Sequence, residues 1–113
     1  MNIALDFDET YTLDPEFWER FIDNAFECNH EVFIVTSRDE VLDWDNRFRV
    51  FHDGPIQVVW CDGKPKRGVC ESLGIKIDVW IDDMPEVITK GSRFTPEQLA
   101  EWRTKNKEAA KQG

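Results

Sequence analysis

The sequence contains no long hydrophobic run and has few basic residues. Its 113 residues include 23 Asp and Glu but only 14 Lys and Arg, which gives a net charge of −9. A surface of this charge repels polyanions, so general nucleic-acid binding is not expected without a local basic patch. No apolar run approaches the length of a membrane span, and no segment resembles a signal peptide. We therefore expect a cytoplasmic protein with no membrane partner.

Cysteine and histidine are also scarce. The three cysteines, Cys28, Cys61 and Cys70, are odd in number and form no C-x-x-C pattern. This disfavours a disulfide framework and a zinc site, and predicts buried or half-buried free thiols in a reducing compartment. The two histidines, His30 and His52, show no metal-ligand spacing.

The apolar content is sufficient for one core. Hydrophobic residues make up 41% of the chain and include 8 Phe and 5 Trp. A chain of this length normally forms one domain, so we expect a single domain over residues 1–113.

Four short apolar runs alternate with segments of helical periodicity. The expected strands are Asn2–Phe7, Glu31–Thr36, Ile56–Cys61 and a strand within Ile75–Ile81. The expected helices are Asp14–Asn29, Asp39–Phe51, Pro65–Leu73 and a C-terminal helix within 95–113, with a frayed end. This alternation predicts βαβ units with right-handed crossovers, and hence an α/β fold around a mostly parallel sheet.

Acidic and hydroxyl residues follow the ends of the expected strands. Asp6 and Asp8 come at the end of the first apolar run, Thr36 ends the second strand, and Asp82 follows the fourth. A carboxylate taken out of water is costly unless it is paired, bound to a metal or used in chemistry. Since ligands of parallel sheets bind beyond the carboxyl ends of the strands, we expect these residues to converge there.

Four short motifs occur in a recognisable order. They are Asp6-Phe7-Asp8-Glu9-Thr10, Thr36-Ser37-Arg38, Lys64 with Lys66, and Asp82-Asp83. Together they resemble the four motifs of the haloacid dehalogenase (HAD) superfamily, and the resemblance covers most of the chain. It implies a Rossmann-like three-layer α/β/α sandwich and Mg²⁺-dependent phosphatase activity. The motifs are too closely spaced for an inserted cap domain, so we expect a small capless member with an open site.

The resemblance implies specific roles for the first acidic pair. Asp6 would be the nucleophile that forms an aspartyl-phosphate, because a carboxylate is already ionised at neutral pH. The Asp8 side chain would protonate the leaving oxygen and then activate water as a base. An enzyme with these two roles is a phosphohydrolase, also called a phosphatase.

The second and third motifs would bind the substrate phosphate. The Thr36 hydroxyl and the Ser37 N–H would donate to its oxygens. Arg38 would help to hold it or would pair with a nearby acid, and the first role is preferred. A lysine would neutralise the oxygens in the transition state. Lys66 is preferred for this role because it follows Pro65 at an expected helix start, and Lys64 remains the alternative.

The remaining carboxylates would hold the metal. Asp6 and Asp82 would bind Mg²⁺ through their side chains, Asp8 through its backbone carbonyl, and Asp83 directly or through water. One or two carboxylates and the substrate phosphate are sufficient for this ion, which keeps several waters.

Other interpretations remain open. Taken singly, Asp82-Asp83 also fits a solvated turn, and Thr36-Ser37 a helix N-cap. The phosphoryl group could pass to an acceptor other than water, or the chain could be a receiver-like or catalytically silent interaction module. In receivers the phosphoacceptor Asp ends the third strand, where this chain has Cys61-Asp62-Gly63. The substrate is a small ester or a macromolecular phosphate, a nucleic-acid end included; the sequence does not identify it, nor the oligomeric state.

Overall fold

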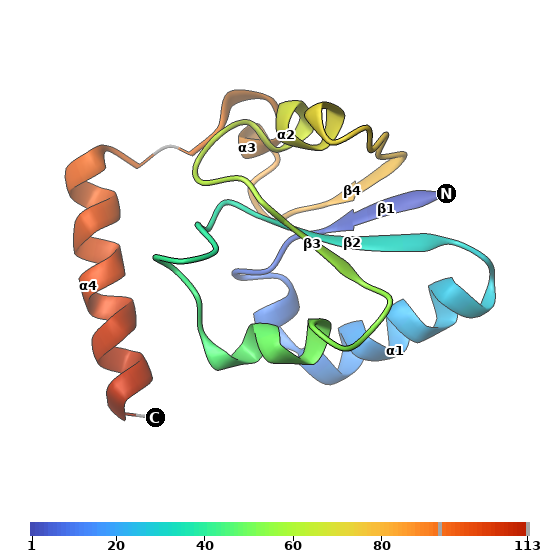
Figure 1. Ribbon diagram of the computed structural model, residues 1–113, viewed down its shortest axis with the longest axis horizontal. Coiled ribbons are helices and arrows are strands. Elements are labelled where there is room, and N and C mark those ends of the chain that lie inside the picture. Colours follow the sequence, from blue (N-terminus) through green and yellow to red (C-terminus); the bar gives the residue numbers. More distant parts are fainter. Residues whose placement is uncertain (93, 113) are drawn as a thin grey trace.

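The computed structural model describes residues 1–92 and 94–112, with side chains in the last helix described as far as residue 107. Its centre is a four-stranded sheet in the order β3-β2-β1-β4, in which every neighbouring pair is parallel (Figure 1). The strands are β1 (Asn2–Leu5), β2 (Glu31–Thr36), β3 (Gln57–Trp60) and β4 (Val79–Ile81). The expected parallel α/β fold is therefore confirmed; β2 has the expected bounds, and the other three strands are shorter than the apolar runs.

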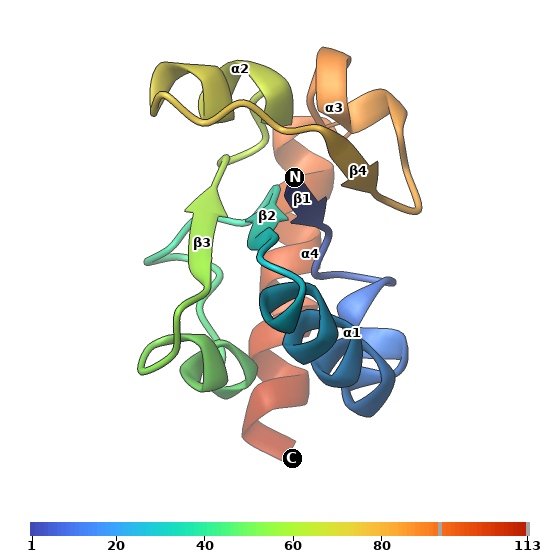
Figure 2. The same ribbon diagram turned by 90° about the vertical axis from the view of Figure 1, so that its right-hand side faces the viewer.

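Helices lie on both sides of the sheet. The helices are α1 (Pro15–Glu27), α2 (Lys66–Ser72), α3 (Glu86–Lys90) and α4 (Pro96–Gln112), with 3-10 helices η1 (Tyr11–Leu13) and η2 (Asn46–Phe51). Figure 2 shows α1 on one side of the sheet and α2 and α3 on the other. Within the described part of the chain, none of the helices combines the length and apolar character that crossing a bilayer requires.

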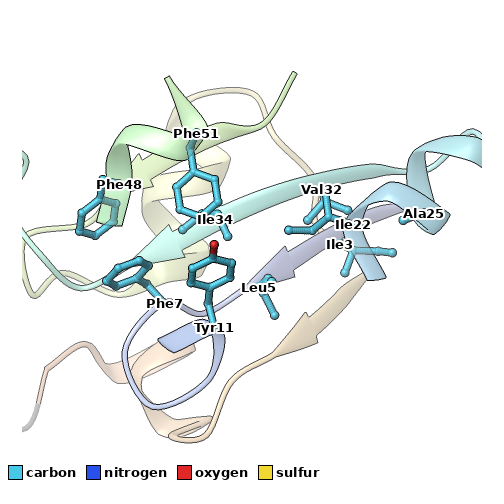
Figure 3. Close-up of a cluster of buried hydrophobic side chains, with 10 residues drawn as sticks. All are labelled: Ile3, Leu5, Phe7, Tyr11, Ile22, Ala25, Val32, Ile34, Phe48 and Phe51. Atoms are coloured by element: carbon cyan, nitrogen blue, oxygen red, sulfur yellow. The ribbon is translucent and has the colours of Figure 1, made fainter. Parts of the chain in front are cut away.

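Each face of the sheet contributes to its own cluster of buried side chains. Along β1, Ile3 and Leu5 belong to one cluster and Ala4 to the other, as the alternation of a strand requires. The larger cluster is shown in Figure 3 and contains Ile3, Leu5, Phe7, Tyr11, Ile22, Ala25, Val32, Ile34, Phe48 and Phe51. The second cluster contains Ala4, Val35, Val59, Cys61 and Cys70. Covering on both faces explains why the strands read as continuous apolar runs.

The helix ends predicted from sequence are confirmed at two N-termini. The Asp14 side chain accepts a hydrogen bond from the Phe17 N–H at the start of α1. At the start of α4, the Gln98 N–H donates to Thr95 Oγ1, and the Thr95 N–H donates to Gln98 Oε1. This reciprocal pair is a capping box, which satisfies backbone donors that the helix itself cannot pair.

The helix expected over Asp39–Phe51 is wrong. Only its second half is helical, as η2, and the first half is a chain of turns. The Asp39 side chain accepts the N–H groups of Val41 and Leu42, and its own N–H donates to Asp43 Oδ2. Aspartate side chains here take backbone N–H groups alongside a helical i→i−4 bond, from the Asp43 N–H to the Asp39 carbonyl at 3.0 Å, and the apolar periodicity therefore did not produce an α-helix.

Two further features differ from the sequence prediction. The segment after β4 contains the short helix α3, which is not among the helices expected from the sequence. Cys28 is exposed, whereas Cys61 and Cys70 are buried as expected, and all three thiols are free.

Candidate active site

A buried lysine connects two of the predicted acidic residues. Lys66 begins α2, and its Nζ lies 2.7 Å from Asp6 Oδ1 and 2.6 Å from Asp82 Oδ2. Lys66 is 1% exposed and Asp6 7%. Burial lowers the pKa of Lys66, but the charges of Asp6 and Asp82 outweigh it and raise the pKa above its usual value, so the ammonium stays charged.

Asp6 lies where β1 ends, between two neighbouring elements. Its N–H donates to the Ile81 carbonyl at 2.9 Å, which extends the pairing with β4, and its Oδ2 accepts from the Thr10 hydroxyl at 3.2 Å. Burial is the largest influence on the carboxyl and raises its pKa to about 7, although the positive charge of Lys66 opposes the shift. A second positive charge nearby would hold Asp6 fully ionised at neutral pH.

Asp6, Asp82 and Asp83 form a compact acidic group. Each can offer a carboxylate oxygen, and these oxygens lie within 4.8 Å of one another. Three carboxylates without a thiol or an imidazole suit a hard divalent cation that prefers oxygen ligands. Asp82 is also fixed by the Met84 N–H, which donates to its Oδ1 at 2.9 Å. The residues present therefore fit a metal site.

Asp8 lies beside this group and binds Arg38. The Arg38 guanidinium donates to both Asp8 oxygens, at 2.9 Å from Nε and 2.7 Å from Nη2, and also to Asp45 Oδ2 and the Asp43 carbonyl. Burial lowers the pKa of Arg38, but hydrogen bonding and charge from Asp8 and Asp45 raise it above the usual range. Arg38 is 4% exposed. Through this buried arginine, the second sequence motif holds the Asp8 side chain of the first motif.

The other predicted substrate-binding residues differ in accessibility. The Thr36 side chain is fully buried and its Oγ1 accepts the Arg38 N–H. Ser37 is half-buried, and its carbonyl accepts the Gly63 N–H at 2.9 Å. Lys64 is exposed, so of the two candidate lysines it is Lys66 that the structure places against the acids.

A cavity of about 200 Å³ opens at this edge of the sheet. Seven of the predicted site residues line it: Asp6, Asp8, Ser37, Arg38, Lys66, Asp82 and Asp83. Thr36 and Lys64 are not among the described residues of its wall. Residues far apart in sequence thus converge at one place, as the strand-end argument predicted.

The cavity also has lining residues that the sequence did not reveal. Asp43, which is 2% exposed, lies in the segment expected to be helical. Leu99 and Trp102 come from α4, a helix to which the sequence assigned no part in the site. Arg103 of the same helix binds Asp43 through two hydrogen bonds of 2.7 and 3.1 Å. No local pattern marks such a pair, because the partners are 60 residues apart.

Comparison with known proteins adds no relative: no family model matches the chain, and no match was found among curated proteins or solved structures. A function for this chain must therefore be inferred from the geometry of the site.

Proposed function

We propose that this protein is an Mg²⁺-dependent phosphohydrolase of the HAD type, with Asp6 as its nucleophile. The observation that carries the proposal is the buried Lys66 ammonium shared by Asp6 and Asp82 at the carboxyl edge of a parallel sheet. The finer fold proposed is a Rossmann-like three-layer sandwich without a cap domain. Helices on both sides of the sheet and the short connection from Asp8 to α1 support it.

The acidic group supplies the ligands for the metal. Asp6 and Asp82 would hold Mg²⁺ by their side chains, Asp83 directly or through water, and Asp8 by its backbone carbonyl. The bound ion would offset the repulsion between the Asp6 carboxylate and the substrate phosphate.

The chain's own residues account for the covalent steps. An Asp6 oxygen forms a bond to phosphorus while the bond to the leaving oxygen breaks, and Asp8 gives that oxygen its proton. Asp8 then takes a proton from water, which attacks phosphorus and releases phosphate with Asp6 restored. Arg38 binds the ionised Asp8 carboxylate through both oxygens, which suits the base step; for the acid step Asp8 must carry a proton, so one hydrogen bond of this fork must open first. Lys66 stabilises negative charge next to Asp6.

Ser37 completes the proposed phosphate site, whereas Thr36 is fully buried, is not among the described residues of the cavity wall, and supports the Arg38 backbone from behind. Ser37 lines the cavity and offers its N–H to a phosphate oxygen. The Thr36 hydroxyl accepts the Arg38 N–H.

The proposal is tested by hydrolysis of p-nitrophenyl phosphate with and without Mg²⁺. Asp6→Asn should abolish turnover, and Asp8→Asn should reduce it by a factor on the order of 10² to 10⁴. Asp53→Asn, at an exposed position outside the cavity wall, is the matched control. Metal-independent turnover, or wild-type turnover by Asp6→Asn, would contradict the proposal. Trapping the phospho-enzyme with alcohols in place of water distinguishes a hydrolase from a phosphotransferase.

The receiver-like alternative has less support. Asp62, which follows β3 where receivers carry their phosphoacceptor, lies outside the compact acidic group among the described residues. Its carboxylate is 3.5 Å from Arg103 instead. The acids therefore gather at Asp6, not at Asp62.

A further inference from the structure

The C-terminal helix covers the site that was expected to be open. Figure 1 shows α4 standing beyond the carboxyl ends of the strands, across the edge where the cavity lies. Leu99 and Trp102 of α4 and Phe94, which precedes it, line the cavity. Met84 and Val87, from the segment after β4, add to this lining. An apolar wall therefore stands next to the acidic group.

Contacts of Trp102 and Arg103 hold α4 in this position, and besides its contact with the cavity wall Arg103 lies 3.5 Å from Asp62. The Trp102 ring lies 5.0 Å from the Arg38 guanidinium carbon, a cation–π distance. Arg103 makes a charged fork with the buried Asp43 carboxylate. Because Arg38 also binds Asp8, the Trp102 ring and the proposed acid contact the same guanidinium group.

The charges of the wall restrict the leaving group. Six carboxylates line the cavity, from Asp6, Asp8, Glu9, Asp43, Asp82 and Asp83. The cations of the described wall are Lys66 and Arg38, and both are already engaged in ion pairs. A second phosphate or a carboxylate on the substrate would therefore meet negative charge without a free cation to bind it.

We propose that the substrate is a small phosphomonoester whose leaving group is a neutral planar ring, and that Trp102 is the residue that selects it. This inference depends on the proposed function. The cavity volume of about 200 Å³ lies below that of pockets for drug-sized ligands, which fits a single ring with its phosphate. A ring packed against an indole gains more than an alkyl chain does, because aromatic pairs add to the burial of apolar area.

The experiment compares kcat/KM for benzyl phosphate and ethyl phosphate. Both release alcohols, so the ratio of the two values reports contact with the ring. Trp102→Ala should lower the benzyl-to-ethyl ratio by about 3- to 10-fold, the equivalent of one aromatic pair. Trp102→Phe should retain most of the ratio. Glu101→Ala, the exposed neighbour on the same helix, is the control and should leave the ratio unchanged.

Four outcomes separate this inference from the proposed function. If the wild type hydrolyses neither these esters nor p-nitrophenyl phosphate with Mg²⁺, the proposed function fails; if it hydrolyses p-nitrophenyl phosphate alone, the inference about the leaving group fails. If it hydrolyses both esters and Trp102→Ala leaves the ratio unchanged, the selection by Trp102 fails and the phosphatase remains. If the wild type hydrolyses 4-carboxybenzyl phosphate with the same kcat/KM as benzyl phosphate, the preference for a neutral leaving group fails. If Trp102→Ala does not fold, Trp102→Leu replaces it, because leucine keeps an apolar side chain without the ring. This variant is expected to show the same fall in the benzyl-to-ethyl ratio.

Discussion

The Asp8 carboxylate receives two hydrogen bonds from Arg38, at 2.9 Å from Nε and 2.7 Å from Nη2. The planar guanidinium matches the two carboxylate oxygens, and such forks fix orientation as well as charge. The fork joins the first sequence motif to the second across 30 residues of chain. Arg38, expected to hold phosphate, thus positions the side chain proposed to move the proton.

Replacing this arginine by lysine tests the importance of the fork. Arg38→Lys keeps the charge but cannot bind both Asp8 oxygens and Asp45 together. We expect the free energy of unfolding to fall by about 1–3 kcal/mol, because a buried hydrogen-bonded group loses partners. Urea denaturation measures it. Arg20→Lys, whose partner Glu16 is exposed, should change stability by less than about 0.5 kcal/mol. Equal effects of the two substitutions would contradict a structural role for the fork.

Removing Lys66 should be more costly. Lys66→Met leaves the buried carboxylates of Asp6 and Asp82 without their shared cation. Breaking a buried pair in this way costs about 3–5 kcal/mol, and turnover should be lost as well. Lys64→Met at an exposed position should leave both nearly unchanged.

The Lys66 variant also has an internal check. Adding Asp6→Asn to Lys66→Met should recover part of the lost stability, since one unpaired charge is then removed. A larger loss of activity from Lys64→Met than from Lys66→Met would assign the motif lysine to position 64.

The raised pKa of Asp6 predicts how stability depends on pH. The pKa of about 7 in the folded state lies above the ordinary pKa of 3.8 for an aspartate, so the folded state binds the proton more tightly between these two pH values. The contribution of Asp6 to the stability of the folded state is therefore greatest below pH 3.8. It decreases as the pH rises from there through about 7, and it stays low at higher pH. Ionised Asp6 is a destabilising group in the metal-free protein.

Asp6→Asn removes this titration, so in the metal-free protein the difference in melting temperature between the variant and the wild type should move in favour of the variant as the pH rises from about 5 to about 8. The absolute stability of the variant also reflects the loss of the ion pair with Lys66. Asp53→Asn measures the effect of removing one surface charge and is subtracted. A difference that is the same at both pH values, or that moves in favour of the wild type at the higher pH, would show that burial does not control Asp6.

The sheet and the acidic group were predictable because their signals are local. Each strand is a short apolar run, and Asp6 and Asp82 stand directly after two of these runs. Parallel pairing of β1 with β4 then brings them together, since Leu5 pairs with Ile81. The convergence of the acids thus follows from sequence position and sheet topology alone.

The misplaced elements depend on interactions that no local pattern records. The turns from Asp39 arise because aspartate side chains take backbone hydrogen bonds in a segment with helical periodicity. The position of α4 over the site depends on pairs such as Arg103 with Asp43, whose partners are distant in sequence. The pairing of Arg38 with an acid was an open alternative from sequence, but its partner could not be named, because Asp8 is distant in sequence.

Gly91 is the position where the fold should tolerate a side chain least. Its φ is +80°, and a Cβ there would lie 2.7 Å from the Gly63 carbonyl oxygen and 3.3 Å from Pro65. Gly91→Ala should therefore lower stability by about 2 kcal/mol or more. Gly68, inside α2 with open space around it, is the matched control. Gly68→Ala should raise stability by about 0.5–1 kcal/mol, because alanine favours the helix. Urea denaturation that ranks the two variants in the opposite order would contradict this account.

The three thiols should differ sharply in reactivity, because alkylation requires the thiolate. Burial raises the pKa of Cys61 to about 12 and also raises that of Cys70, so both remain thiols at moderately alkaline pH. Cys28 is exposed at the end of α1. Native protein treated with iodoacetamide at about pH 8 should gain one adduct quickly, at Cys28, and the other two only after denaturation. Mass spectrometry of tryptic peptides locates the adducts. Cys28→Ser should abolish the fast phase, and rapid labelling of Cys61 in that variant would mean that the second core cluster opens under native conditions.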